Sequence, residues 1–317
     1  MITDRGHPAT LFELRDVTHA YGRVCALREL SLQVSRGPIG LVGQNGAGKS
    51  TLIQILLGLL RARRGTAWML GQDVARHPLA LRGRIGYMPE RDAFVSGLTG
   101  IEYVALAGQL SGMGRKQAWR RAHETLSYLG LEEARYRRLE EFSVGMKQRL
   151  KLAAALVHDP EVLLLDEPTA GLDPEGRTAM LGVLHALADR PDKSLLLSTH
   201  LLGDIERVCR HVVILDRGTL LHSGPVETLR RARPRRYRLR WQGQGEERWL
   251  QALQQRGIEL VEPPAGGEVS VTVPENWTCR QFFRESLAHP LVITGLEPEE
   301  DDLETVYEQL VTGGRKR

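Results

Sequence analysis

One stretch decides the fold of this chain, Gly43-Gln44-Asn45-Gly46-Ala47-Gly48-Lys49-Ser50, which matches the pattern G-x-x-x-x-G-K-[ST] at every fixed position. A strand-like run, residues 31–43, leads into the stretch, and a helical pattern from Lys49 to about Arg61 follows it. Glycine lets the backbone wrap closely around phosphate groups, and the loop amides and the helix N-terminus donate to anions. The stretch therefore predicts a nucleotide-phosphate site between a strand and a helix.

The side chains of this loop have distinct expected roles. Lys49 is expected to bridge the β- and γ-phosphates, and the hydroxyl of Ser50 to ligate Mg²⁺. The expected nucleotide contacts come from the whole loop and the residue after it: Gly43, Gln44, Asn45, Gly46, Ala47, Gly48, Lys49, Ser50 and Thr51.

Polar residues end or follow two apolar runs that are typical of buried strands. Asp166 ends the run VLLLD, residues 162–166, and Glu167 comes directly after it. His200 comes directly after SLLLST, residues 194–199. Ligands of open α/β sheets bind at the carboxyl ends of the strands. We expect Asp166 to hold Mg²⁺ directly or through water, and Glu167 to orient or deprotonate the attacking water. His200 is expected to donate a hydrogen bond to a γ-phosphate oxygen.

Strands and helices alternate along the first part of the chain, which predicts an α/β fold with a largely parallel sheet. Residues 92–160 read as an all-helical insert, a separate subdomain. The run VVILDRGTLLHSG predicts a hairpin that turns at Asp216–Gly218.

Together, these motifs resemble the ATP-binding subunit of ABC transporters, over about residues 11–230. The deciding element is Phe142-Ser143-Val144-Gly145-Met146, followed by Lys147-Gln148-Arg149. It is similar to the family signature L-S-G-G-Q, and closer to the Y-S-x-G-M-K-Q-R variant that is frequent in bacterial exporter ATPases. The resemblance implies an ABC ATPase domain over residues 10–228. That domain is a P-loop NTPase with a helical subdomain and an antiparallel β subdomain.

The resemblance also assigns the remaining site residues. Gly171-Leu172-Asp173-Pro174 is similar to the D-loop, and Tyr21 resembles the aromatic residue that stacks on adenine, although an aromatic at a strand end equally suits plain packing. Glu90 stands in the place of the Q-loop glutamine, where it could ligate Mg²⁺ or couple to a partner. In the family, two head-to-tail subunits sandwich two ATP molecules, which places Ser143 and Gly145 against the γ-phosphate bound by the other subunit. Val144 and Met146 depart from the signature and remove a side-chain contact there.

The formal net charge of +4 comes from one cluster of seven arginines within residues 228–240. We interpret residues 229–240 as a basic linker. A solvated hinge is one reading of it, and a contact with anionic headgroups or with a permease is a second. Nucleic acid is the least favoured partner. The cluster consists of Arg230, Arg231, Arg233, Arg235, Arg236, Arg238 and Arg240.

The rest of the chain, residues 236–311, reads as β-α-β-β-α-β-α, which predicts a small ferredoxin-like α+β accessory domain with one extra helix. Residues 303–310, LETVYEQL, resemble the L-E-x-x-[FY]-x-x-L ending of ATPases that serve ABC-2-type exporters. The same apolar stripe also suits an ordinary core.

The function implied is ATP- and Mg²⁺-dependent hydrolysis that powers an ABC-2-type exporter through ATP-driven dimer closure. The implied partners are a second ATPase subunit, as a homodimer, and a separate transmembrane permease that docks around Glu90 to Gly100 and on the helical insert. This places the chain on the cytoplasmic face of the cell membrane. Its apolar runs are too short to span a bilayer. The three cysteines lack metal-ligand spacing, which argues against a zinc site.

Two other functions stay open at this stage. One is a soluble ABC-type ATPase that acts on nucleic acid or ribosomes, which the arginine cluster favours. The other is a nucleotide-gated regulatory module with little hydrolysis, which Glu90 and the altered signature favour.

Overall fold

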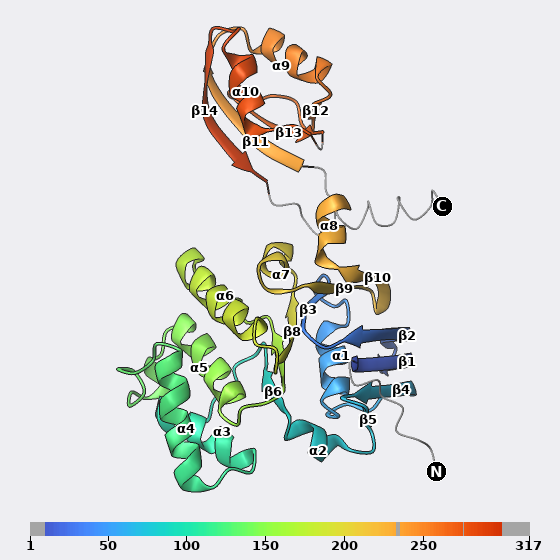
Figure 1. Ribbon diagram of the computed structural model, residues 1–317, viewed down its shortest axis with the longest axis vertical. Coiled ribbons are helices and arrows are strands. Elements are labelled where there is room, and N and C mark those ends of the chain that lie inside the picture. The colour runs from blue at the N-terminus through green and yellow to red at the C-terminus, as the bar shows by residue number, and fades with distance from the viewer. Residues whose placement is uncertain (1–9, 233–234, 275, 300–317) are drawn as a thin grey trace. The chain divides into compact units, whose positions relative to one another are not determined.

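The computed structural model describes residues 10–232, 235–274 and 276–299, which form two units (Figure 1). The first unit is Met1–Glu227 and the second is Thr228–Arg317. Each is described by itself below.

A six-stranded sheet forms the centre of the first unit, in the order β10-β9-β3-β8-β7-β6. Its strands run parallel except β10, which pairs with β9 in the predicted antiparallel hairpin. Every residue of β3, β7 and β8 is buried, which explains why their sequences are apolar without alternation. The bounds are β3 (Pro38–Val42), β6 (Ile85–Met88), β7 (Val162–Asp166), β8 (Ser194–Thr199), β9 (His211–Asp216) and β10 (Thr219–Pro225).

A second, antiparallel sheet has the order β2-β1-β4-β5 and packs against α1 and the central sheet in one apolar core. Strands β4 and β5 were not predicted from the sequence. Helix α1 is shorter than predicted, because it ends at Leu56 and is followed by Gly58 in a left-handed conformation (φ 63°). The bounds are β1 (Thr10–Tyr21), β2 (Val24–Ser35), β4 (Arg64–Met69), β5 (Gln72–Asp73) and α1 (Lys49–Leu56).

Helices α3, α4 and α5 pack on one another, on the side of this unit away from β1, β2 and β4 (Figure 1). Thr99 starts α3 with a capping box, in which its hydroxyl accepts from the Glu102 amide and the Glu102 carboxylate accepts from the Thr99 amide. The bounds are α2 (Pro78–Arg82), α3 (Gly100–Leu110), α4 (Arg115–Tyr128), the 3-10 turn Leu139–Glu141, α5 (Val144–Leu156), α6 (Pro174–Ala188), α7 (Leu202–Val208) and α8 (Val226–Ala232).

The second unit has the strand order β12-β13-β11-β14 with all neighbours antiparallel, so the ferredoxin-like prediction is confirmed for this part. Trp249 and Phe282 are buried at the centre of its core. The extra helix predicted at residues 303–310 lies outside the described residues. The bounds are β11 (Arg235–Gly243), α9 (Glu246–Gln255), β12 (Glu259–Leu260), β13 (Glu268–Val273), α10 (Cys279–Ser286) and β14 (Leu291–Pro298).

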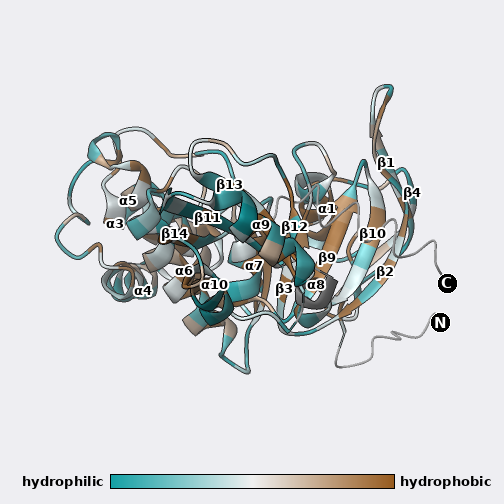
Figure 2. Ribbon diagram, turned by 90° about the horizontal axis from the view of Figure 1, so that it is seen from above, coloured by the Kyte–Doolittle hydropathy of each residue, from teal (hydrophilic) through white to brown (hydrophobic). Residues whose placement is uncertain are grey.

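The arginine cluster is not a continuous linker, because its described part is split between helix α8 and strand β11. On β11, Arg238 pairs with Glu299 (2.8 Å) and Arg240 pairs with Glu268 (2.8 Å) and Glu297 (3.3 Å). The polar character of β11 contrasts with the apolar β9 in Figure 2. The partner carboxylates come from residues 28 to 61 positions away, so the sequence shows the arginines without their counter-charges.

Candidate functional site

The phosphate loop joins β3 to α1 and depends on glycine geometry at several points. Gly46 and Gly48 have left-handed backbones, with φ of 85° and 103°. A Cβ on Gly48 would lie 2.6 Å from the carbonyl oxygen of Ala26, and one on Gly43 would lie 2.5 Å from that of Leu215. The loop conformation is therefore closed to larger residues at these positions.

A cleft of about 430 Å³ opens over this loop. It brings together the predicted phosphate-binding, adenine-stacking and acidic residues from four parts of the sequence. Tyr21 is half exposed at the cleft, where its hydroxyl faces Gln54 Oε1 at 3.4 Å and its ring packs edge-on against His19, with centroids 4.9 Å apart. The lining residues are Tyr21, Val24, Cys25, Ala26, Gln44, Asn45, Gly46, Ala47, Gly48, Lys49, Ser50, Thr51, Glu90, Asp166 and Glu167.

Lys49 and Glu167 form an ion pair inside this cleft. Lys49 Nζ lies 3.4 Å from Glu167 Oε1 and donates to the carbonyl oxygen of Gly43 at 2.7 Å. The two side chains are only 7% and 8% exposed. Glu167 has a left-handed backbone (φ 48°), and its amide donates to the Ser198 carbonyl oxygen at 2.9 Å. The lysine thus neutralises a buried carboxylate next to the phosphate loop.

Asp166 and His200 meet at the same sheet edge, as predicted, because β7 and β8 are neighbours in parallel register. Asp166 is 2% exposed, and Ser198 Oγ donates to its Oδ1 at 2.7 Å. His200 Nδ1 lies 3.1 Å from Glu167 Oε2, and its side chain is half exposed. His200 therefore contacts the predicted catalytic carboxylate while its ring remains accessible.

Glu90 lines the cleft and is held through its backbone by Lys151, a residue that the sequence analysis missed. Lys151 Nζ donates to the carbonyl oxygens of Pro89 (3.1 Å) and Glu90 (2.9 Å) and pairs with Asp92 at 3.3 Å. Burial lowers the pKa of Lys151, against the opposing effect of Asp92. Burial also raises the pKa of the neighbouring Tyr87 to about 12, with Asp166 and Glu90 adding to the effect, so Tyr87 stays neutral.

The signature residues lie apart from this cleft. Ser143 caps α5 and accepts from the Met146 amide at 3.3 Å. Gly145 and Asp173 line a second pocket of about 310 Å³, which shares no residue with the phosphate cleft. Asp173 also caps α6 by accepting from the Gly176 amide at 2.8 Å. Ser143, Gly145 and Asp173 are thus not brought to the phosphate loop of their own chain.

A buried polar cluster, also missed from the sequence, connects the segment after Glu167 to α6 and α7. Asp204, on α7, is 1% exposed. Its Oδ2 accepts from Thr169 Oγ1 at 2.7 Å, and its Oδ1 accepts from Arg177 Nε at 2.8 Å and pairs with Arg177 Nη2 at 2.7 Å. No helix was predicted at residues 202–208, so the sequence did not indicate that Asp204 would be buried next to Thr169 and Arg177.

Comparison with known proteins agrees with this geometry. The family model described as ABC transporter matches residues 27–170. The bacitracin transport ATP-binding protein BcrA of Bacillus licheniformis is 33% identical over 310 residues, 96% of this chain and 99% of its own. The uncharacterized ABC transporter ATP-binding protein YxlF of Bacillus subtilis is 32% identical over 302 residues, 95% of this chain and 99% of its own.

A solved structure of the ATP-binding subunit of an ABC transporter has the same fold. It is 32% identical, with a TM-score of 0.61, and the match covers 70% of this chain and 92% of that one. The implied fold and ATPase activity are therefore confirmed at the level of the family. The chain belongs to the ATP-binding, ATP-hydrolysing proteins of ABC transporters.

Proposed function

We propose that this chain powers an ABC-2-type exporter as one of two identical ATPase subunits that close around ATP. One observation carries the dimer: the signature residues Ser143 and Gly145 lie outside the phosphate cleft of their own chain. A helix N-terminus capped by serine suits an anion. Two copies arranged head to tail would place each signature against the cleft of the other and complete both sites.

Hydrolysis follows from the ion pair in the cleft. Phosphate groups that enter the cleft compete with Glu167 for Lys49, because phosphate oxygens offer a stronger partner for the ammonium group. The freed Glu167 carboxylate then orients the attacking water and accepts its proton. His200 Nδ1 lies 3.1 Å from this carboxylate, and its half-exposed ring would donate to the γ-phosphate through Nε2.

The donor set also fits Mg²⁺. Magnesium binds to proteins through one or two oxygen ligands and keeps phosphate and water oxygens for the rest. The Ser50 hydroxyl and the buried Asp166 carboxylate, which Ser198 fixes, supply such oxygens at the cleft. The bound ion would neutralise charge on the phosphates during hydrolysis. Glu90, at the cleft rim, is the further oxygen ligand or the link to a partner.

The export role is supported by the length of the match to BcrA, a protein that is named for bacitracin transport. The match covers 96% of this chain and therefore includes the second unit. The ABC-2-like ending at residues 303–310 lies outside the described residues. No described helix is long and apolar enough to cross a membrane. We assign the crossing to a separate permease that docks at Glu90 to Gly100 and on the helical insert, at the cytoplasmic face of the membrane. Residues 91–93 and 95–97 in that segment are exposed.

The reading as a nucleic-acid ATPase rested on the arginine cluster. Arg238 and Arg240 are paired with carboxylates, which removes their part of that support.

Gel filtration tests the dimer. Glu167→Gln should convert from monomer to dimer when ATP and Mg²⁺ are added, because bound ATP is no longer hydrolysed. Adding Ser143→Arg should abolish the dimer, whereas Gln117→Arg, an exposed change on α4, should not. A dimer that survives Ser143→Arg contradicts the head-to-tail arrangement.

Coexpression with a candidate ABC-2-type permease tests the export role. The chain should move to the membrane fraction with that permease, and Val95→Arg should reduce the shift, because Val95 is half exposed on the proposed docking segment. A chain that stays off the membrane in the presence of the permease contradicts this role.

A further inference from the structure

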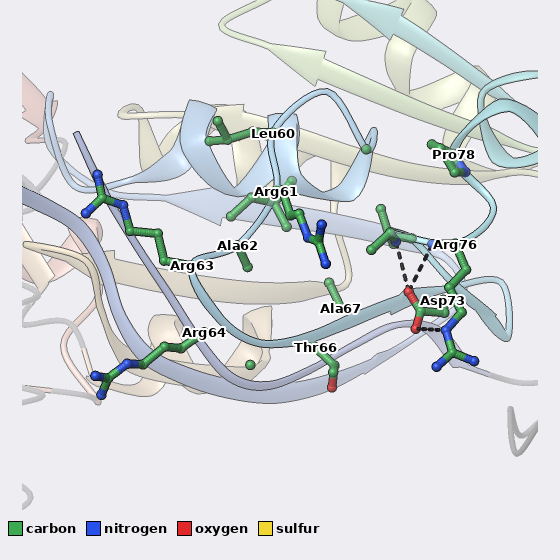
Figure 3. A pocket seen from close by; sticks show the side chains of 15 residues that line it. Leu60, Arg61, Ala62, Arg63, Arg64, Thr66, Ala67, Asp73, Arg76 and Pro78 are labelled. Carbon is green, nitrogen blue, oxygen red and sulfur yellow. Dashed lines mark hydrogen bonds and ion pairs between the residues drawn. The ribbon is translucent and has the colours of Figure 1, made fainter. Parts of the chain in front are cut away.

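A third pocket, larger than the two described above, lies within the first unit at the C-terminal end of α1 (Figure 3). Its volume is about 770 Å³, and it shares no lining residue with the phosphate cleft. Its walls come from the end of α1, the segment 58–64, the start of β4 and the segment 73–78. It is therefore a separate site on the same structural unit.

Arginine dominates the charge of this pocket, since four arginines line it against a single carboxylate, Asp73. Asp73 is already occupied, because its Oδ1 accepts from the amides of Ala75 (2.9 Å) and Arg76 (3.3 Å) and its Oδ2 pairs with Arg76 Nε at 3.5 Å. Figure 3 shows this pair at one end of the pocket. The three arginines that remain are Arg61, Arg63 and Arg64.

These three arginines have no carboxylate partner among the described residues. Across residues 10–232, 235–274 and 276–299, no carboxylate oxygen lies within 4.0 Å of any of their guanidinium groups. With Arg76 offset by Asp73, the pocket has a local charge of +3. Such a charge attracts anions to a concave surface more strongly than to a flat one.

The backbone that presents them is fixed by hydrogen bonds, whereas their side chains are exposed, and Figure 3 shows the side chains of Arg63 and Arg64 extending away from Arg61. The Arg63 amide donates to the Thr18 carbonyl oxygen at 2.9 Å, and Arg64 pairs with Thr18 between β4 and β1. The Arg61 carbonyl oxygen lies 3.0 Å from His19 Nδ1. Gly65 completes the frame, because its φ is 79° and a Cβ there would lie 2.3 Å from the Arg15 carbonyl oxygen.

We propose that this pocket binds a phosphate-bearing anion. The guanidinium fork matches the spacing of phosphate oxygens, and ligand pockets of about 300–1,000 Å³ take small molecules or headgroups. Two sources share this chemistry: the headgroup of an anionic phospholipid and a free phosphorylated small molecule. The ligand is distinct from the ATP of the phosphate cleft, which lies at the other end of α1.

The test uses the full chain with its phosphate cleft already filled. Glu167→Gln is saturated with ATP and Mg²⁺, and Arg61→Gln, Arg63→Gln and Arg64→Gln are added together. A control variant loses the same charge at three exposed arginines outside the pocket, by Arg115→Gln, Arg248→Gln and Arg280→Gln. Each protein is sedimented with phosphatidylglycerol or phosphatidylcholine vesicles and titrated with pyrophosphate by calorimetry. Basal ATPase activity, measured with Glu167 intact, should be unchanged in both triple variants.

The pocket variant should bind its ligand about 100-fold more weakly than the control, at roughly five-fold for each arginine. Loss on phosphatidylglycerol vesicles alone identifies a headgroup, and loss with pyrophosphate identifies a free phosphate compound. Equal binding by the two triple variants to both probes overturns the proposal. The ATP-driven dimer of Glu167→Gln is scored separately, so its failure would bear on the proposed function and not on this pocket.

Discussion

Replacing Asp204 by asparagine is the most informative perturbation of the site's framework. Asp204 is not among the residues that line the phosphate cleft, yet it joins Thr169, two residues after Glu167, to Arg177 on α6. It also lies four residues after His200 on the chain. The substitution keeps the shape of the side chain and removes only its charge.

The cost follows from the contacts. The asparagine oxygen can still accept from Thr169, but its amide group then faces Arg177, so that two donors meet where the buried Asp204 carboxylate was paired with a part-buried arginine. Breaking a buried pair by removing one partner costs about 3–5 kcal/mol. At the lower end, about 3 kcal/mol, the melting temperature of a unit of this size falls by about 6–12 °C.

Calorimetry of the full chain at pH 7 measures this shift in the transition of the first unit. Asp189→Asn is the matched control, because Asp189 pairs with Arg210 on the surface and its side chain is 54% exposed. Loss of such a pair costs at most about 1 kcal/mol. We also expect a lower kcat in Asp204→Asn, with ATP affinity largely kept, because the contacts to ATP remain in place.

A double-mutant cycle with Arg177→Met isolates the pair. If Asp204→Asn destabilises the chain by less than about 1 kcal/mol, or if the coupling to Arg177 is near zero, the cluster does not hold the segment after Glu167 as argued.

Three further outcomes follow from the site and its surroundings. Glu167→Gln should lower kcat by about 10²–10⁴-fold while ATP binding persists, and near-normal turnover would exclude Glu167 as the base. Gly48→Ala should abolish ATP binding in a nucleotide titration, because its Cβ would collide with the Ala26 carbonyl; unchanged affinity would contradict the loop geometry. Burial lowers the pKa of His158 from 6.5, so the stability it contributes is full above about pH 6.5 and falls as the unfolded state takes up a proton below that pH. His158→Gln should flatten the decline in melting temperature between pH 7 and 5, and an unchanged slope would show that other groups cause it.

The sequence predicts the residues at the strand ends well because they follow a local rule. Residues 162–165, which precede Asp166, are apolar at every position, as a strand buried on both faces must be, and the polar residue that ends the strand lies at the ligand edge of the sheet. The phosphate loop can also be predicted from local sequence, because the glycines at positions 46 and 48 themselves indicate the left-handed backbone that the structure shows there.

Contacts between distant segments escape such reasoning. The linker interpretation of residues 229–240 was misleading because the carboxylates of Glu268, Glu297 and Glu299 reach Arg238 and Arg240 only once β11 lies between β13 and β14. Lys151 was missed for the same reason, since the carbonyl groups it binds lie 61 and 62 residues earlier.

His19 lies between the basic pocket and the phosphate cleft and contacts a residue of each. Its Nδ1 contacts the carbonyl oxygen of Arg61 at the rim of the basic pocket, and its ring contacts Tyr21 at the rim of the ATP cleft. It is 7% exposed, so its ring packs between these two neighbours with little contact with solvent. If two ligands share this residue, thermodynamic linkage is reciprocal. Whatever factor an anion in the basic pocket applies to ATP affinity, ATP must apply to the affinity for that anion.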